Sequence, residues 1–300
     1  MLLGPTASGK SDVAMELARQ RGDVEVIAVD AMQVYRGMDV GTAKPTRADR
    51  LEVPHHGIDL VEPGDTFTVS DFQRCANRAL TEIEEAAHIA VLVAGTGLYL
   101  TAVIDELRLP GEWPAIRAEL EVEAANGEAL AELHARLVAL DPVAASRIEQ
   151  NNERRIVRAL EVCLGSGQPF SSFGPGTDAY PTIATPQVGL RWNREILGQR
   201  IASRVHSMID RGLLDEVSAL LAAPGGLSRT ARQALGYKEL IGVVQHGAPL
   251  ADAIDQIILR TRQFAVRQER WFRRDPRIRW VDIITDPVAD VLPVVQEYLA

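Results

Sequence analysis

A glycine-rich segment near the start of the chain has the residue types and spacing of a phosphate-binding loop. It reads Gly4-Pro5-Thr6-Ala7-Ser8-Gly9-Lys10-Ser11 and fits the pattern Gly-x-x-x-x-Gly-Lys-[Ser/Thr]. The glycines allow a tight turn whose amide N–H groups point into one concavity. Lys10 adds a positive charge for the outer phosphates, and the Ser11 hydroxyl is placed to bind Mg²⁺. We predict a phosphate site, and most loops of this pattern hold ATP or GTP.

Two further polar residues follow apolar runs that read as buried strands. Asp30 comes directly after residues 24–29, and Gly95-Thr96 comes directly after residues 89–94. In a parallel sheet the carboxyl ends of the strands share one edge, so both residues are expected to face the phosphate loop. Asp30 would be a metal ligand or a general base there, with a helix cap or turn as the alternative. Thr96 can hydrogen-bond a leaving phosphate oxygen but cannot act as a base.

The second of these strand ends lacks the acid of ordinary nucleotide hydrolases. Such proteins usually carry a Mg²⁺-binding Asp there, together with a residue that positions water. Here the strand ends in Gly95-Thr96 instead. Lys10, Ser11, Asp30 and Thr96 together make a site from which a pyrophosphate could leave while Asp30 takes a proton from a nucleophile.

Composition places these residues in an ordinary globular protein. The 300 residues suffice for one large domain or two modest ones, and 46% are hydrophobic and 24% charged. No stretch is long and apolar enough for a membrane span, and the N-terminus leads into the loop rather than a signal peptide. Cys75 and Cys163 lack metal spacing, which predicts a reducing, cytoplasmic location. His55-His56 has no third ligand at a suitable spacing, so we expect a packing or turn role for the pair.

A strongly basic segment stands out against the net charge of −9. Between Arg260 and Trp280 there are eight arginines and two acidic residues, a local charge of +6. Phe264, Trp271 and Phe272 are interleaved with the arginines. Basic and aromatic residues in alternation are typical of a surface that binds polyanions, whereas a solvated helix face is the plain alternative.

The order of the expected elements indicates an α/β protein. Strands at 24–29, 89–94, 187–192 and 278–283 alternate with helical stretches, which predicts a P-loop NTPase-like parallel sheet flanked by helices. The strand before the loop is reduced to residues 1–3, which leaves the true start of the protein open. We expect one long amphipathic helix through 201–221 and another over about 250–274. Residues 166–186 read as a long connection.

A helical insertion interrupts this core. From residue 113 to about 165 the pattern is helical, with a stripe formed by Leu130, Leu133, Leu137 and Leu140. We therefore expect a core made of residues 1–111 and 186–300, and an inserted helical subdomain over 112–185.

The same residues resemble a known family, the bacterial tRNA dimethylallyltransferases (isopentenyl-tRNA transferases). The resemblance extends from residue 2 to about 282 and rests on eight blocks in one order. These are residues 4–11, 30–35, 38–45, 54–56, 95–99, 154–162, 235–238 and 267–273. Ala31 departs from the pattern, because the family usually has Ser there. We find no Cys/His zinc module near the C-terminus, which matches the bacterial form.

The resemblance implies transfer of a dimethylallyl group from dimethylallyl diphosphate to N6 of the adenosine at tRNA position 37, beside the anticodon. The loop, Gly4 to Ser11, would then hold the donor's diphosphate with Mg²⁺ on Ser11. Asp30 would take the N6 proton, and Thr96 would polarise the leaving diphosphate. Arg200 and Arg204 are candidates for a second clamp on the diphosphate, with solvated helix arginines as the alternative. We expect a cytoplasmic monomer with no membrane association.

The resemblance also assigns residues to the tRNA anticodon stem-loop. The target base must leave its stack to reach Asp30. The implied contacts are Asp30, Ala31, Met32, Gln33, Arg117, Arg154, Arg155, Ile156, Val157, Arg158, Gln233, Gly236, Tyr237, Lys238, Arg267, Gln268, Arg270, Trp271 and Arg273.

Three other functions remain open from the sequence. A P-loop kinase of a small molecule or nucleotide would need ATP and no RNA, and it leaves the basic segment unexplained. A nucleotide-dependent RNA-binding module would tolerate the loss of Asp30. An adenylate isopentenyltransferase acting on free AMP or ADP would have no use for the C-terminal arginines.

Overall fold

The structure is a computed structural model, and it describes residues 1–125, 129–174, 176–177 and 179–299. The chain forms two compact units, one made of residues 1–104 with 180–300 and the other of residues 105–179. The second unit therefore begins and ends a few residues earlier than the predicted 112–185. None of the described helices is both long and apolar enough to cross a membrane.

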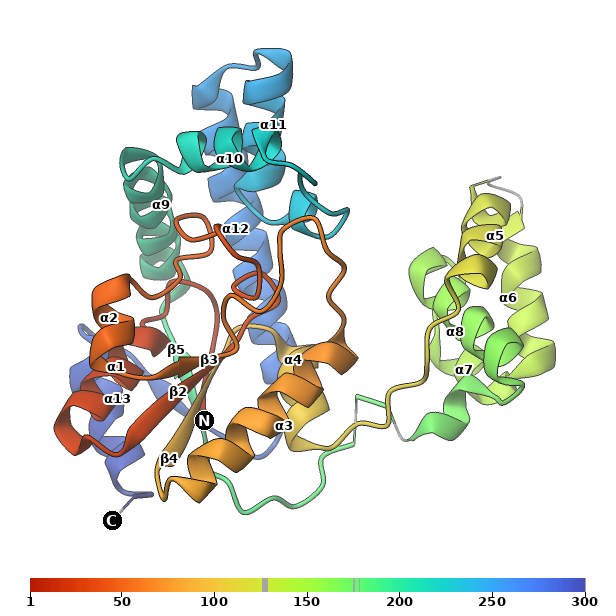
Figure 1. The fold of residues 1–300 in the computed structure, drawn as a ribbon. Helices are drawn as coiled ribbons and strands as arrows, with labels where there is room; N and C mark the ends of the chain where they lie inside the picture. Colours follow the sequence, from red (N-terminus) through yellow and green to blue (C-terminus); the bar gives the residue numbers. More distant parts are fainter. Residues whose placement is uncertain (126–128, 175, 178, 300) are drawn as a thin grey trace. The chain divides into compact units, whose positions relative to one another are not determined.

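The larger unit is built on one parallel sheet (Figure 1). Its strands pair in the order β3-β2-β4-β1-β5-β6. Their bounds are β1 Leu2–Leu3, β2 Val24–Val29, β3 His55–His56, β4 Ile89–Ala94, β5 Gln187–Arg191 and β6 Ile278–Asp282. This confirms the predicted fold class and the four predicted strands.

Helices cover both faces of this sheet. The helices before the second unit are α1 Lys10–Arg21, α2 Arg47–Glu52, α3 Val69–Glu85 and α4 Gly97–Ile104. Those after it are α9 Arg194–Asp210, α10 Leu213–Ala222, α11 Tyr237–His246, α12 Leu250–Phe272 and α13 Pro287–Gln296, with a short 3-10 turn η2 at Ala231–Gln233. In Figure 1, α1 and α13 lie together, and α3 and α4 lie together.

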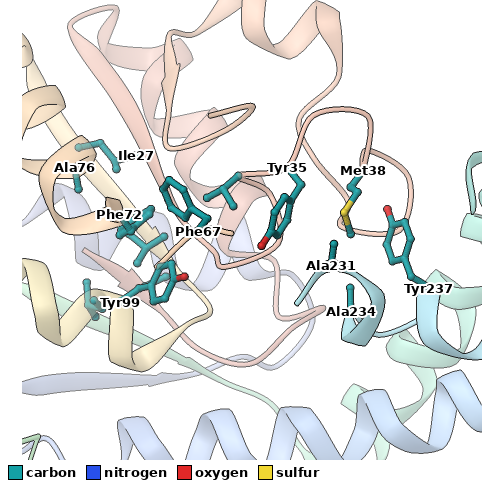
Figure 2. Close-up of a cluster of buried hydrophobic side chains, with 14 of the residues drawn as sticks. Ile27, Tyr35, Met38, Phe67, Phe72, Ala76, Tyr99, Ala231, Ala234 and Tyr237 are labelled. Atoms are coloured by element: carbon teal, nitrogen blue, oxygen red, sulfur yellow. The ribbon is translucent and has the colours of Figure 1, made fainter. Parts of the chain in front are cut away.

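The strands carry apolar side chains on both faces because each face of the sheet packs against its own layer of helices. In β2, Val24 and Val26 join the core formed with α1 and α13, whereas Ile27 and Val29 join the core formed with α3 and α4. This period of two on a continuous apolar run is the pattern of a strand that is buried on both faces. Figure 2 shows the second core, where Phe72 and Tyr99 meet with ring centroids 4.8 Å apart.

The strand register brings three loops to one edge of the sheet. Leu3 of β1 is level with Ala94 of β4, and Ala94 is level with Val29 of β2. The next residues along these strands are Gly4, Gly95 and Asp30, so all three leave the sheet side by side. The phosphate loop and the two predicted polar strand ends thus share one edge.

One predicted helix is wrong. The amphipathic pattern over 201–221 is divided between α9 and α10, which are separated at Arg211 and Gly212. Gly212 has φ 91°, a left-handed conformation that glycine adopts without the steric penalty of a side chain. The apolar period continues across the break because both helices pack on the same core.

The smaller unit is a helical bundle with its own core. It contains α5 Pro114–Ala124, α6 Ala129–Leu140, α7 Pro142–Arg147, α8 Glu153–Ser166 and the 3-10 turn η1 Phe170–Phe173. Leu133 and Leu137 of the predicted stripe are fully buried, whereas Leu140 is 42% exposed. The stripe therefore faces the core over its middle and leaves it at the helix end.

The two histidines flagged in the sequence form the edge strand β3. His56 Nε2 lies 2.6 Å from Glu25 Oε2, and His55 Nδ1 lies 2.8 Å from the Val53 carbonyl. Within the described ranges no group of three or more His, Cys, Asp or Glu could hold a metal ion. The predicted packing role for the pair is consistent with these contacts.

Substituting Gly97 should destabilise the larger unit. A Cβ on this residue would lie 2.1 Å from Cδ1 of the Trp271 indole, so α12 would have to shift away from α4. We expect Gly97→Ala to lower the free energy of unfolding by about 1–3 kcal/mol, the usual cost of overpacking. Denaturant unfolding measures the change.

The matched control is Gly242→Ala, within α11, where no atom lies within 4 Å of the added Cβ. It should be neutral or stabilising by about 0.5–1 kcal/mol through helix propensity. Equal loss in both variants would show that the contact between Trp271 and Gly97 does not set the position of α12.

Candidate functional site

The phosphate loop has a preorganised backbone. Ala7 and Gly9 adopt left-handed φ values of 62° and 92°, and α1 begins at Lys10 directly after them. The Lys10 ammonium donates to the Pro5 carbonyl over 2.7 Å and to Ser8 Oγ over 3.3 Å, so the side chain folds back across the loop. The loop thus presents a helix N-terminus and a cation to the same cleft, which is the arrangement that binds phosphate.

Residues far along the chain donate hydrogen bonds to the backbone carbonyls of this loop. Trp192 donates its indole N–H to the Ser8 carbonyl over 2.9 Å, and the Arg200 guanidinium donates to the Ala7 carbonyl over 2.9 Å. Arg200 also stacks over Trp192, 4.5 Å from the ring centroid. A Cβ on Gly9 would meet Pro287 at 2.4 Å. The loop is therefore enclosed by β5, α9 and α13.

Lys10 and Arg204 are two largely buried cations that line the same cleft. The pKa of Lys10 is lowered to about 7, mainly by burial and also by the positive charge of Arg204, while Asp30 acts in the opposite direction. Burial also lowers the pKa of Arg204, again with Asp30 opposing. Asp12 also raises the pKa of Arg204, but neither cation forms an ion pair with a carboxylate of the described residues, so a bound anion would supply negative charge that the site lacks.

Asp30 is fixed at the end of β2 by backbone amides. Its Oδ1 accepts hydrogen bonds from the N–H groups of Met32 at 2.8 Å and Gln33 at 3.2 Å. Oδ2 has no hydrogen-bond partner in the described part of the chain, and an ideal Cβ on Gly95 would lie 3.7 Å from it. One carboxylate oxygen thus orients the group and the other stays available to a ligand.

Thr96 lies beside the same turn. Its Oγ1 accepts a hydrogen bond from the Ala31 N–H over 3.2 Å, which leaves the hydroxyl hydrogen free to donate. Ala31 makes this contact through its backbone, so the contact does not depend on the side chain at this position. The Gln33 amide donates to the Thr42 carbonyl over 3.1 Å and so holds the next loop against the turn.

A cleft of about 1030 Å³ connects these groups. Thr6 to Ser11 form one wall, and Asp30, Gln33 and Gly95 form another. Thr96 is not among the lining residues. The remaining wall includes Lys44, Arg200, Ser203, Arg204, Arg211, Phe264 and Gln268.

Lys44 of the cleft wall and Glu216, which lies outside it, make contacts that had no signal in the sequence. Lys44 is buried and bonded to Asp59 and Asp39 at 2.7 Å each. Glu216 of α10 accepts the backbone N–H groups of Asp39 and Val40, together with the Tyr237 hydroxyl. These pairs join segments more than a hundred residues apart or cross a loop, so spacing along the chain could not reveal them.

The basic segment of α12 and β6 is only partly available for a ligand. Four of its arginines are paired with carboxylates: Arg260 with Glu239, Arg273 with Glu269, Arg277 with Asp275, and Arg279 with Glu297. Arg267 lies over Phe264 and Arg274 over Trp271. Arg270 is exposed and has no ion-pair partner among the described residues.

The residues assigned to tRNA in the smaller unit differ in exposure. Arg154 and Arg155 are exposed on α8, whereas Ile156 and Val157 are buried in the helical core. Arg158 pairs with the buried Glu161 at 2.9 Å, and Arg117 lies 4.0 Å from the same carboxylate. The side chains of Ile156 and Val157 are therefore not available to a ligand.

A third assigned group lies at the start of α11. Gln233 and Lys238 are exposed and bonded to each other over 3.0 Å. Gly236 is buried, and Tyr237 is fully buried with its ring over Gly41. Tyr237 belongs to the core drawn in Figure 2, next to Met38 and Ala234.

Comparison with known proteins places the chain in a family. A model described as IPP transferase matches residues 33–275, and one described as Isopentenyl transferase matches residues 1–54. The chain belongs to the IPP transferase family.

Relatives in this family are similar over nearly their whole length. The chain is 47% identical over 282 residues to a tRNA dimethylallyltransferase of Pseudarthrobacter chlorophenolicus, covering 94% of this chain and 92% of that protein. It is 45% identical over 284 residues to one of Geobacter metallireducens, covering 93% and 90%.

Solved structures of similar proteins agree with this family assignment. A tRNA isopentenylpyrophosphate transferase of Bacillus halodurans matches with a TM-score of 0.69 and 36% identity, over 99% of this chain and 95% of the other. A eukaryotic dimethylallyltransferase acting on tRNA matches with a TM-score of 0.81 and 26% identity, over 100% and 77%. The family is one of prenyl-transferring enzymes, so the kinase alternative loses its support.

Binding of a diphosphate should draw a proton onto Lys10. The free group has a lowered pKa of about 7, and a bound anion raises it, so affinity falls as the pH rises above that value. At about pH 8 dimethylallyl diphosphate is fully ionised, since the second pKa of a phosphate monoester is about 6. We expect uptake of roughly one proton per diphosphate bound at about pH 8, and no uptake at about pH 6, where Lys10 is already protonated and the half-protonated donor releases protons on binding.

Calorimetry in two buffers of different ionisation enthalpy measures this uptake in the absence of tRNA. Lys10→Met is the control, and it should bind more weakly and without the uptake. Uptake that persists in Lys10→Met would assign the proton to another group.

Proposed function

We propose that the chain transfers a dimethylallyl group from dimethylallyl diphosphate to N6 of the adenosine at tRNA position 37, with release of diphosphate. The observation that carries the proposal is the meeting of the phosphate loop and Asp30 at one sheet edge, in a chain of the IPP transferase family. Relatives that are 47% and 45% identical to the chain bear the name tRNA dimethylallyltransferase.

The diphosphate is assigned to the loop and its cations. Lys10 and Arg204 lie in the cleft wall with Arg200, and the loop amides lie at the N-terminus of α1. As the C–O bond to the diphosphate breaks, negative charge develops on the leaving oxygen, and positioned donors stabilise it. Thr96 is assigned to the same oxygen because its hydroxyl hydrogen is free.

Asp30 is assigned as the general base. An exocyclic arylamine is a poor nucleophile, so removal of its proton as the C–N bond forms contributes about 10²–10⁴-fold. The proton passes from N6 to Oδ2, the carboxylate oxygen without a hydrogen-bond partner among the described residues. The amides of Met32 and Gln33 keep Oδ1 in place during the transfer.

The donor set fits a Mg²⁺ ion that accompanies the diphosphate. Mg²⁺ is usually bound through one or two protein oxygens and substrate phosphates, and it keeps several waters. Ser11 and Asp12 supply oxygens beside the loop in the cleft wall, with no dedicated carboxylate cage in the described part of the chain. The ion, held by Ser11, would neutralise part of the charge of the diphosphate.

The tRNA acceptor is assigned to exposed basic residues and one exposed glutamine. Arg154 and Arg155 of the smaller unit, Lys238 and Gln233 of α11, and Arg270 of α12 are exposed and suited to phosphate contacts. All these residues belong to one chain, so the proposal needs no second copy. A cytoplasmic location follows from the tRNA substrate.

The direct test is incubation with dimethylallyl diphosphate, Mg²⁺ and unmodified tRNA, followed by mass analysis of the nucleosides. Asp30→Asn and Thr96→Ala should each lower kcat by at least about 10²-fold, because one loses the base and the other a donor to the leaving group. Binding of tRNA should change little. Near-wild-type turnover of either variant on saturating tRNA would contradict the assigned mechanism.

Arg270, an exposed arginine of α12, should contribute to salt-dependent tRNA binding. Removal of one phosphate contact lowers the slope of log K against log salt by about 0.7 on single-stranded RNA. We expect this change for Arg270→Ala and a smaller one for Arg273→Ala, whose guanidinium already pairs with Glu269. Fluorescence anisotropy across a KCl series measures the slopes.

Arg78→Ala is the matched control for Arg273→Ala, since Arg78 is an exposed arginine of α3 outside the basic segment and also pairs with a carboxylate four residues away, Glu82. It removes the same charge and should leave the slope unchanged. An unchanged slope in Arg270→Ala would identify the α12 arginines as an ordinary solvated face.

A further inference from the structure

Gln268 joins two parts of the site that are far apart in the chain. Its Oε1 accepts the backbone N–H of Thr6 over 2.8 Å, and its Nε2 donates to the Gly95 carbonyl over 2.7 Å. The residue is 7% exposed and lies on α12, 262 residues from Thr6 and 173 residues from Gly95. One amide thus spans from the phosphate loop to the turn after β4.

The second of these contacts lies next to the reacting groups. Gly95 directly precedes Thr96, and an ideal Cβ on Gly95 would lie 3.2 Å from Gln268 Nε2 and 3.7 Å from Asp30 Oδ2. Three residues further along α12, the Trp271 indole packs against Gly97. Helix α12 therefore contacts the β4–α4 turn at Gly95 and at Gly97, the residues on either side of Thr96.

These contacts assign a different role from the one that the family resemblance implies for Gln268. A side chain that reads a base must offer its polar atoms to the RNA, whereas both ends of this amide are engaged inside the protein. Loss of the amide would leave the Thr6 N–H and the Gly95 carbonyl, both partly buried, without this partner, and unpaired groups of this kind are costly. The exposed neighbours Arg267 and Arg270 remain available to RNA.

We infer that Gln268 is a positioning residue that sets the distance between the phosphate loop and the Thr96 turn. This role rests on the proposed function and extends it to a side chain of the cleft wall whose amide is bonded to the protein at both ends. Since the leaving diphosphate must lie between the loop amides and Thr96, a small error in their separation weakens donor binding and slows the transfer together.

The first test is donor binding in the absence of tRNA. Gln268→Met keeps the length of the side chain and removes both hydrogen bonds. We expect its affinity for dimethylallyl diphosphate, measured by calorimetry, to fall about tenfold and kcat to fall about 10–100-fold, with the Kd for tRNA changed less than about threefold.

The matched control is Gln263→Met, the same substitution at an exposed position of the same helix. It should leave all three values unchanged. If Gln268→Met weakened tRNA binding and left donor affinity intact, Gln268 would be an RNA contact and the inference would be overturned.

A double-mutant cycle with Thr96→Ala tests the mechanism of the effect. If Gln268 acts by placing Thr96 against the loop, Gln268→Met should cost much less in kcat once Thr96 is Ala, because the two changes remove the same interaction. Additive losses would overturn the inference. General damage to the fold would give additive losses together with a lowered Tm.

Gln268→Asn replaces Gln268→Met if the latter does not fold. It keeps a polar amide on a stem one methylene shorter, and we expect the same loss of donor affinity because the amide can no longer span both partners. The binding measurement needs no prenyl transfer. A wild-type chain that bound the donor but modified no tRNA would refute the proposed function while still testing Gln268.

Discussion

The pairing of one very short strand constrains the rest of the site. β1 is only Leu2–Leu3, yet it lies between β4 and β5 and is hydrogen-bonded in parallel to both. Both residues are fully buried, one on each face of the sheet. A shift of one residue in this pairing would exchange the two faces and move the phosphate loop relative to Asp30 and Gly95. Burial on both faces therefore fixes the loop despite the short strand.

The electrostatics of the cleft follow from this placement. The loop brings Lys10 to the side of Arg204, in a site where burial penalises both charges, and Asp30 is the carboxylate that raises the pKa of both. If this site had only a structural role, each buried cation would be expected to form an ion pair with a carboxylate. Leaving the cations short of negative charge lowers stability and favours an anion of high charge density, which a diphosphate supplies.

Much of this site could be predicted from the sequence because it depends on local patterns. The loop motif, the apolar runs before Asp30 and Gly95 and the parallel α/β alternation are each legible within about ten residues. The division of 201–221 into α9 and α10 was missed because the apolar period runs on through Gly212. The contacts of Trp192, Glu216 and Gln268 join distant segments, so only the folded chain shows them.

The basic segment shows why composition overstates a binding surface. A local charge of +6 treats the eight arginines alike, whereas the fold pairs Arg260 and Arg279 with the carboxylates of Glu239 and Glu297, which lie outside the segment. Arg277 is held between Asp275 and the Pro181 carbonyl. These arginines fasten α12 and β6 to their neighbours, and Arg270 and its exposed neighbours on α12 are left for a polyanion. Helix α12 thus carries exposed arginines on its outer side and the buried Gln268 on its inner side, so one rigid element would relate the proposed RNA contacts to the proposed position of the leaving group.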